Sequence, residues 1–545
     1  MRFQSNNSSR GGLSSWGAYI EVFAFLLIGS FGVYAALTAG ISYDEDAEFR
    51  TYLVNASAIS GLLNGSSEAY THLLQYVDRY YGIGFHIFSH GLTSVLSQSM
   101  DGLLPFSPLG SRLIWGHAAV FIIFLGSGVL FRACLLSLTK DRLIASLGMF
   151  TFLLWPYLLG HALMNVKDIP FMFGWLCCTY LALRIFELPT QFSKDLVVRL
   201  LLLGAFTGWL MSIRVSGILI FVEYFWLACF WYCGSHKIKI SMTFAQVIGI
   251  TSFFLLAFAL TIFSFYPILW HNPFELINAL RFMSSHPWLG DTLTAGKLVE
   301  PKTHLIFYIA AWHLVKLPIF VIVGLLLASY FLLQDFMRRE SDDCYKAISA
   351  LYLSALTICG LLILQRVALY NELRQILFIA PLLMMIAVVG LRSMSRVFTI
   401  LILVVTSAFM LIDDLDLNPY QYTYINEVAR HTDIGKKYET DYYGLAVKET
   451  ALWLNSSHVD GKSQCLYVPA KHLWEFAIDP QKFPCVSGFP GDLSLIAKPF
   501  LFFVQARSVT SFRAPPWCRV IHAEERSLPF SSAKLRMGEL YECKP

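Results

Sequence analysis

The stretch "GAYIEVFAFLLIGSFGVYAALTAGISYDEDAEFR", residues 17–50, decides the fold class, because an apolar run passes directly into a cluster of acids. Residues 17–39 are almost continuously apolar, and a helix needs roughly 20 such residues to cross a bilayer. Four carboxylates follow within the ten residues 41–50. We therefore expect a membrane span whose end carries an unusual amount of negative charge.

The composition indicates that most of the chain lies in a membrane. Of 545 residues, 56% are hydrophobic and only 14% are charged, whereas a soluble domain carries about 25% charged residues. The net charge of +4 is small, and no nucleic-acid partner is expected. The predicted fold class is an α-helical polytopic membrane protein. About eleven apolar runs are candidate spans: 17–39, 113–138, 143–161, 169–187, 198–213, 216–233, 243–268, 305–334, 346–365, 375–392 and 396–412.

Lysine and arginine occur in alternate loops between these runs, together with the N-terminal segment. Such residues favour the cytoplasmic side, so the N-terminus is predicted to be cytoplasmic. The first run is expected to remain as an uncleaved anchor, since "LTAG" is a poor signal-peptide cleavage site. We expect a multi-pass protein of a bacterial inner (plasma) membrane. The cations are Arg2, Arg10, Lys140, Arg142, Arg184, Lys194, Arg199, Lys237, Lys239, Arg338, Arg339, Arg392 and Arg396.

Two domains are predicted, a membrane-embedded unit at 1–412 and an extracytoplasmic (periplasmic) domain at 413–545. The first has large outer loops at 40–112 and 269–304. The second is polar, with Pro and Gly clusters and short apolar runs, and is expected to be small and mixed α/β. Its even number of cysteines suggests two disulfides with three possible pairings, and four free thiols are the alternative. These cysteines are Cys465, Cys485, Cys518 and Cys543.

Every outer turn contributes a charged residue or a histidine. Any one of them could be an ordinary solvated or paired loop residue, but the set converges on one face of the membrane. Ionisable groups at the bilayer edge still require partners. The set comprises Asp44, Glu45, Asp46, Glu48, Lys167, Asp168, Arg214, His271, Asn272, Arg366, Glu372 and Arg374.

Carboxylates beside cations at this depth favour one chemistry. A carboxylate can act as general base on an acceptor hydroxyl, and arginine or lysine can hold a phosphate. A lipid-linked sugar would place its phosphate here. We therefore predict transfer of a sugar from a polyprenyl-phosphate donor to a lipid, glycan or protein hydroxyl, with inversion. The alternatives are a lipid-linked sugar flippase or transporter, and a structural protein of an envelope complex.

Several motifs, in order along the chain, carry a family resemblance. They are "YDE" (43–45), "NVKDIPF" (165–171), "YPILWHNP" (266–273), "FYIAAWHLVKLP" (307–318), "YNELRQILFIAP" (370–381), "NPYQYTYIN" (418–426) and "DYYGLAVKE" (441–449). Together they resemble the GT-C type membrane glycosyltransferases, in the branch of the protein O-mannosyltransferases and the bacterial aminoarabinose-to-lipid A transferases. The resemblance covers most of residues 15–450 and implies the GT-C fold and a hexosyl or pentosyl transferase.

The resemblance also implies roles for single residues. Asp44 matches the catalytic base, with Glu45 as its neighbour. Asp168 matches a second functional acid, accompanied by Lys167. Arg374 matches an arginine near the lipid phosphate, although Gln375 replaces the histidine that usually follows it.

The remaining outer residues receive weaker assignments. Arg214 and Arg366 are added as candidates for binding the donor phosphate. His271 and Asn272 could position the substrate, although a helix-end hydrogen bond would equally explain His271. Asp46 and Glu48 are interpreted as solvated, and "PWLGD" (287–291) is expected in a loop over the site. No cofactor is certain; a divalent metal beside the carboxylates is possible but is not predicted.

Overall fold

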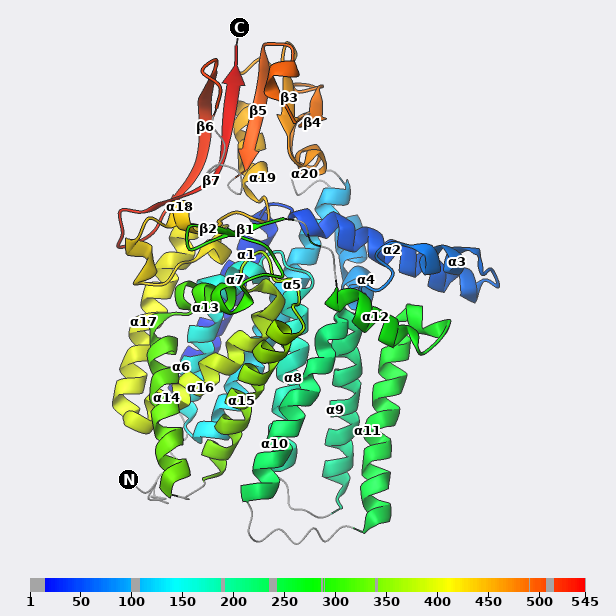
Figure 1. Ribbon diagram of the computed structural model, residues 1–545, viewed down its shortest axis with the longest axis vertical. Coiled ribbons are helices and arrows are strands. Elements are labelled where there is room, and N and C mark those ends of the chain that lie inside the picture. The colour runs from blue at the N-terminus through cyan, green and yellow to red at the C-terminus, as the bar shows by residue number, and fades with distance from the viewer. Residues whose placement is uncertain are drawn as a thin grey trace.

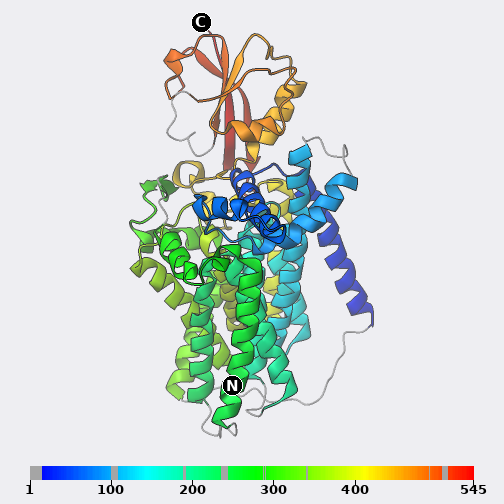
Figure 2. The same ribbon diagram turned by 90° about the vertical axis from the view of Figure 1, so that its right-hand side faces the viewer.

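The computed structural model describes residues 15–99, 108–187, 192–234, 243–285, 288, 290–338, 342–489, 491–505 and 514–544. A bundle of long helices forms one part of the molecule, and a small mixed sheet stands on one end of it (Figure 1). We call this end of the bundle the sheet end. In a view turned by 90°, the sheet keeps this position and α1 (Ser15–Thr38) lies at the edge of the bundle (Figure 2).

The other long helices of the bundle are α5 (Pro108–Thr139), α8 (Asp168–Phe186), α9 (Lys194–Ile213), α10 (Ile220–Gly234), α11 (Phe244–Phe265), α14 (Ile319–Arg338), α15 (Asp343–Leu364), α16 (Ala380–Met394) and α17 (Arg396–Leu417). The remaining helices are α2 (Tyr43–Leu63), α3 (Glu68–Gln75), α4 (Gly84–Ser99), α6 (Arg142–Leu153), α7 (Pro156–Ala162), α12 (Glu275–Ser284), α13 (Leu305–Lys316), α18 (Ile434–Lys437), α19 (Ala446–Ser456) and α20 (Lys471–Glu475). Single 3₁₀ turns are η1 (Val215–Leu219), η2 (Pro267–Trp270), η3 (Arg374–Ile379), η4 (Gln421–Thr423), η5 (Ala429–His431) and η6 (Leu493–Leu495).

The number of spans is smaller than the sequence suggests. Within the described ranges, nine helices are long and apolar enough to cross a membrane, or ten if the bent pair α6 and α7 is one span. The predicted run 216–233 becomes η1 and α10, whose apolar stretch Val215–Trp231 is shorter than the nine spanning helices, although α10 packs against α8 and α15. The count of about eleven is therefore reached only if this shorter helix also crosses.

Two prolines explain where predicted spans break. The run 143–161 bends by 61° between α6 and α7, and Pro156 opens α7. The run 305–334 divides at Pro318 into α13 and α14, and α14 alone is long enough to span, so the predicted start of this span at residue 305 was wrong. Proline disfavours helical backbone in the residue before it, and Leu317 is extended accordingly. Trp312 of α13 donates a hydrogen bond to Thr294, which keeps α13 at the sheet end.

The acidic stretch forms the start of a helix rather than a loop. Helix α2 begins at Tyr43, and Ser42 and Glu45 form a capping box at its N-terminus. Carboxylates in a first turn are stabilised by the helix dipole. In Figure 1, α2 and α3 run across the sheet end of the bundle, not along it. Asp44 and Glu48 are four residues apart and therefore share one face of α2.

The cations used to predict orientation lie away from the sheet where the structure describes them. Lys140 pairs with Glu187, and Arg396 at the start of α17 pairs with Asp141. Arg2, Arg10, Lys237, Lys239, Arg339 and the side chain of Arg338 lie outside the described residues. The side of the membrane on which this end of the bundle lies stays a prediction. The domain boundary at residue 412 also stays a prediction, and helix α17 continues to Leu417.

The C-terminal sheet has five strands in the order β4-β3-β5-β7-β6. β3 (Cys465–Val468) lies parallel to both β4 (Val486–Gly488) and β5 (Phe500–Gln505). β7 (Lys534–Cys543) lies antiparallel to β5 and to β6 (Cys518–Ser527). Disulfides join Cys465 to Cys485 and Cys518 to Cys543. A separate hairpin, β1 (Thr292–Thr294) with β2 (Lys297–Val299), belongs to the outer loop 269–304.

A close backbone contact brings the segment before the sheet onto the bundle. A Cβ atom at Gly160 of α7 would lie 1.9 Å from the Tyr422 nitrogen in η4, so only glycine fits there. Residues 418–445 therefore pack tightly against the sheet end. This packing places side chains from beyond the last span next to those of the outer turns.

Candidate active site

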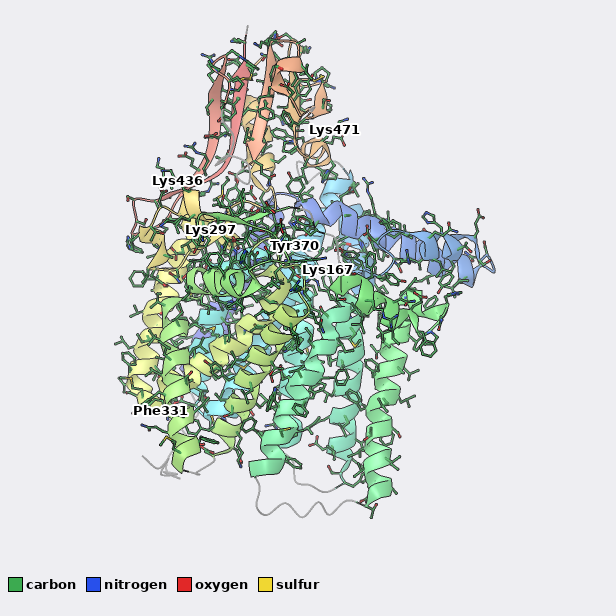
Figure 3. The ribbon with its side chains drawn as sticks, in the orientation of Figure 1. Lys167, Lys297, Phe331, Tyr370, Lys436 and Lys471 are labelled. Atoms are coloured by element: carbon green, nitrogen blue, oxygen red, sulfur yellow. A yellow bond between two sulfur atoms is a disulfide. The ribbon has the colours of Figure 1, made fainter. Side chains whose placement is uncertain are left out.

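A cavity of about 370 Å³ lies at the sheet end of the bundle. Its walls come from α2, from the turn before α8, from the turn after α9, and from the segment leading into η3. Figure 3 shows Lys167 and Tyr370, two lining residues, at the level between bundle and sheet. Six of the nine predicted site residues line this cavity: Asp44, Glu45, Lys167, Asp168, Arg214 and Arg374.

Asp44 and Arg374 form an ion pair at the cavity. Asp44 Oδ2 lies 2.5 Å from Arg374 Nη1. The Asp44 side chain is 46% exposed, whereas Arg374 is only 8% exposed and is held between the rings of Tyr370 and Tyr443. Among the carboxylates of the three ion pairs at the cavity, Asp44 is thus the most exposed.

Asp168 is held much more tightly. Arg214 lies 2.7 Å from Asp168 Oδ1, and Asn165 donates a hydrogen bond of 2.8 Å to Asp168 Oδ2. The Asn165 side-chain oxygen accepts from the Asp168 backbone nitrogen at 2.8 Å, which fixes the start of α8. Since both oxygens have close partners and the side chain is 4% exposed, Asp168 is suited to orienting Arg214.

Lys167 pairs with Glu48 across the same cavity. The Lys167 Nζ to Glu48 Oε1 distance is 2.6 Å, and the ammonium lies 3.8 Å from the centre of the Tyr81 ring. Burial lowers the pKa of Lys167, while the charge of Glu48 raises it. Glu48 also lines the cavity, so its interpretation as a solvated loop residue was wrong. Asp46 instead pairs with Arg50 on the same helix.

Glu45 faces the bundle and has both carboxylate oxygens engaged. Oε1 accepts from the Ser42 backbone nitrogen at 2.7 Å, and Oε2 lies 2.7 Å from Nε2 of the buried His117. His117 Nδ1 lies 3.1 Å from the Ala36 carbonyl, which can only accept, so Nδ1 carries a hydrogen. These contacts anchor α2 to α1 and α5.

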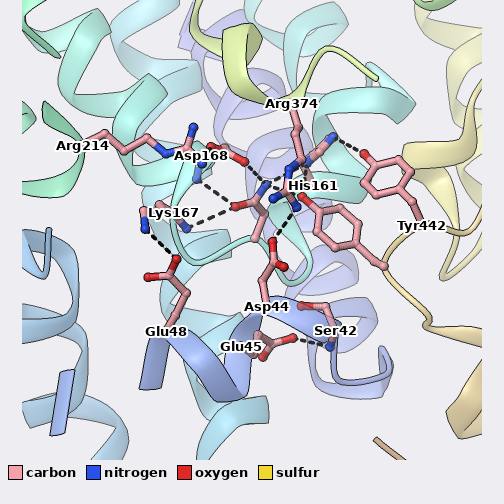
Figure 4. A network of polar contacts seen from close by, with 12 residues as sticks. Ser42, Asp44, Glu45, Glu48, His161, Lys167, Asp168, Arg214, Arg374 and Tyr442 are labelled. Carbon is pink, nitrogen blue, oxygen red and sulfur yellow. Dashed lines mark hydrogen bonds and ion pairs between the residues drawn. The ribbon is translucent and has the colours of Figure 1, made fainter. Parts of the chain in front are cut away.

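Residues from the segment before the sheet complete the network (Figure 4). The Tyr443 hydroxyl accepts a hydrogen bond of 2.8 Å from Asn165, and Tyr443 lines the cavity beside Arg374. His161 lies 2.9 Å from the Asn165 amide and 3.2 Å from the Tyr442 hydroxyl. Burial raises the pKa of Tyr443 well above its ordinary value, so its hydroxyl stays neutral.

The rest of the cavity wall is aromatic and aliphatic. Trp288 stacks on Tyr370 with ring centres 4.1 Å apart and an angle of 6°. Trp288 therefore lies over the cavity, in the segment expected to cover it; Pro287 and Leu289 of that segment lie outside the described residues. Apolar side chains complete the lining, among them Leu219 of η1, Leu362 of α15 and Phe378 of η3.

Three predicted site residues do not reach the cavity. Arg366 is exposed at the end of α15, and His271 is exposed after η2. Asn272 accepts a hydrogen bond from the Phe274 backbone nitrogen and so shapes the turn before α12. The structure does not bring these side chains to the other candidates.

Metal binding was left open by the sequence. Within the described part of the chain, no group of three or more His, Cys, Asp or Glu side chains is placed to hold a metal ion. Asp44, Glu48 and Asp168 each face a cation of the chain instead of one another. The arrangement therefore supplies positive charge from side chains.

Sequence inspection missed four contributors to this site: Glu48, His117, Asn165 and Tyr443. A histidine inside an apolar run, such as His117, is itself a signal of function or of a buried partner. Asn165 and Tyr443 lie within motifs already singled out, "NVKDIPF" and "DYYGLAVKE", but without a residue-level role. Helical spacing from Asp44 would have indicated Glu48.

Comparisons with known proteins concern the chain as a whole. No family model and no curated protein matches it. The S. cerevisiae protein O-mannosyltransferase Pmt1-Pmt2 complex bound to the sugar donor is 13% identical, with a TM-score of 0.34, over 51% of this chain and 38% of that chain. ArnT from Cupriavidus metallidurans bound to undecaprenyl phosphate is 11% identical, with a TM-score of 0.44, over 97% and 98%.

The Archaeoglobus fulgidus oligosaccharyltransferase in complex with zinc and sulfate is 10% identical, with a TM-score of 0.41, over 86% of this chain and 62% of that chain. The chain thus spans 38% of the mannosyltransferase chain but nearly the full length of ArnT. These TM-scores are too low to support an argument about function, so the chemistry of the site is inferred from the residues of this chain alone.

Proposed function

We propose that this chain is an integral membrane glycosyltransferase that moves a sugar from a polyprenyl-phosphate donor to an acceptor hydroxyl. The single observation that carries the proposal is the cavity. Three carboxylate–cation ion pairs, formed between segments far apart in the sequence, line one cavity at the end of an apolar bundle. The aliphatic wall formed by the spans suits a lipid tail, and the cations suit its phosphate.

The reaction follows from the exposure of Asp44. The acceptor oxygen attacks the anomeric carbon from the side opposite the phosphate, and its proton passes to the Asp44 carboxylate. The bond between the anomeric carbon and the phosphate oxygen breaks, and the electron pair leaves with the phosphate. Arg374, with Arg214 and Lys167, stabilises the developing negative charge. One displacement of this kind inverts the anomeric centre.

The same proposal assigns a side of the membrane. The sheet end is the extracytoplasmic (periplasmic) end, in a bacterial inner membrane. Support comes from the two disulfides of the sheet, which persist in oxidising compartments, and from the cations at the opposite end. The acceptor is a lipid, a glycan or a protein hydroxyl.

The test uses the full chain reconstituted in vesicles with polyprenyl-phosphate sugars. Mass spectrometry follows release of polyprenyl phosphate and formation of the glycosylated acceptor. Asp44→Asn should lower the rate by roughly 10²–10⁴-fold. Asp46→Asn is the matched control, because Asp46 lies on the same first turn but pairs with Arg50.

Full activity of Asp44→Asn would overturn the assignment of the base. Movement of a solute or lipid without any glycosyl product would favour the transporter instead. Comparing envelope glycolipids and glycoproteins with and without the gene would identify the sugar and its acceptor.

A further inference from the structure

We propose that Gln505, the last residue of β5, is a positioning residue for this reaction, because its amide connects the C-terminal sheet to both sides of the Asp44–Arg374 pair. The inference rests on the proposed function. β5 is otherwise the buried apolar sequence "FLFFV", so a polar side chain at its end is notable. Gln505 is 7% exposed, which leaves water little access to its amide.

The orientation of the Gln505 amide follows from its two partners. The Asp441 backbone carbonyl can only accept, so it faces the Gln505 Nε2 donor, at 2.9 Å. Gln505 Oε1 then faces the Tyr43 hydroxyl, which donates to it at 2.6 Å. We call the contact with Tyr43 the first contact and the contact with Asp441 the second. Glutamate could keep the first contact but not the second, because a carboxylate has no hydrogen to donate. A buried amide without its partners is costly, so both contacts are expected to persist.

The first contact acts on the helix that carries the base. Tyr43 is the first residue of α2 and directly precedes Asp44. The Tyr43 backbone nitrogen also donates to the Tyr443 carbonyl at 3.1 Å. With its ring and its backbone both held, Tyr43 sets the position at which α2 begins. The Asp44 carboxylate is thereby held toward Arg374.

The second contact acts on the loop that carries Tyr443. The Asp441 carboxylate accepts from the backbone nitrogens of Gly444 at 2.8 Å, Leu445 at 3.1 Å and Ala446 at 2.9 Å. These bonds tighten the loop around Tyr443, whose ring centre lies 5.5 Å from the Arg374 guanidinium. Gln505 therefore connects the sheet to two neighbours of Arg374. It reaches the Asp44 carboxylate through Tyr43, and it reaches the Tyr443 ring through Asp441.

The experiment separates positioning from stability. Gln505→Ala should lower kcat by roughly tenfold to a hundredfold, since small misplacements of reacting groups are costly, and should leave the donor KM unchanged. Amide hydrogen exchange across residues 43–48 should become faster. Gln505→Glu should give an intermediate kcat, and Gln481→Ala, an exposed glutamine of the same domain, should behave as wild type.

Every outcome of this experiment either supports or overturns the positioning role of Gln505. A wild-type kcat in Gln505→Ala with faster exchange would make the contact merely structural and overturn the positioning role. Unchanged exchange across residues 43–48 would overturn the connection to α2, whatever the rate. A Tyr43→Phe variant whose rate loss simply adds to that of Gln505→Ala would also overturn it, because residues that act through one contact are not additive. If the wild-type chain transfers no sugar, the proposed function itself fails, and the exchange data still report on the contact.

Discussion

Asp44 Oδ2 lies 2.5 Å from Arg374 Nη1, although the two residues are 330 positions apart in the chain. Asp44 lies in the first turn of α2, which crosses the sheet end of the bundle. Arg374 is the first residue of η3, the 3₁₀ segment before α16. Their contact joins the first outer segment to the last outer turn. It therefore defines the centre of the proposed site, and the first prediction concerns it.

Arg374→Lys should slow transfer even though it keeps the positive charge. Lysine lacks the planar fork that can contact Asp44, two aromatic rings and a phosphate together. Losing one transition-state donor costs roughly 10²–10³ in kcat, and we expect a loss near the lower end. Steady-state kinetics in vesicles measure it, with Arg50→Lys as the control because that side chain is 68% exposed. A wild-type kcat would show that charge alone suffices at this position.

Glu45→Gln and Glu45→Ala should behave differently if Glu45 positions α2. Glutamine can accept from the Ser42 nitrogen and donate to His117 Nε2, so activity should stay close to wild type. Alanine removes the capping bond and leaves His117 buried without this partner, so the melting temperature should fall. Transfer assays and thermal unfolding in detergent test both variants. If Glu45→Gln is as inactive as Asp44→Asn, Glu45 takes part in the chemistry.

Glu48→Gln should destabilise the protein through Lys167. The two side chains are only 12% and 8% exposed, and removing one partner of a buried ion pair costs about 3–5 kcal/mol. The pKa of Lys167, already lowered by burial, should fall further without the opposing effect of Glu48. The double variant Glu48→Gln/Lys167→Met should lose less stability than the sum of the singles. Additive losses in thermal unfolding would contradict the pair.

Glu372 should make stability depend on pH. It is buried against Lys316 at 2.9 Å, and burial raises its pKa from 4.5 to about 8 despite that cation. Between these values the folded state binds more protons than the unfolded state, so stability falls as pH rises. The contribution is fully present below pH 4.5 and is lost as pH rises through about 8.

Glu372→Gln should flatten this dependence, because glutamine resembles the protonated acid. Unfolding midpoints measured at several pH values across this window provide the test. Glu68→Gln, at an exposed position on α3, serves as the control. A slope in Glu372→Gln equal to that of wild type would locate the proton uptake elsewhere.

Much of the architecture could be predicted from local patterns. Apolar runs indicated a polytopic helical protein, and the polar tail indicated a small mixed domain. The errors were local as well: Pro156 and Pro318 break two runs that hydropathy alone treats as continuous.

The candidate site was predicted in part. One cavity is lined by six of the nine predicted residues, because all six lie in turns or helix starts at the sheet end of the bundle: Asp44, Glu45, Lys167, Asp168, Arg214 and Arg374. Arg366, His271 and Asn272 lie in the same kind of turn but point elsewhere. Position in a turn places a residue at the correct depth, yet it does not fix the direction of a side chain.

The sequence by itself determined which segments are apolar, where the charges follow them, and hence which end of the bundle holds the polar residues. These properties are local, since they depend on the composition of a run of about twenty residues. Only the tertiary structure decided which carboxylate in "ISYDEDAEFR" meets which partner: Asp44 meets Arg374, Glu45 meets His117, and Glu48 meets Lys167. Hydrogen bonds and ion pairs act over about 3 Å, so they are settled by the packing of segments that lie hundreds of residues apart.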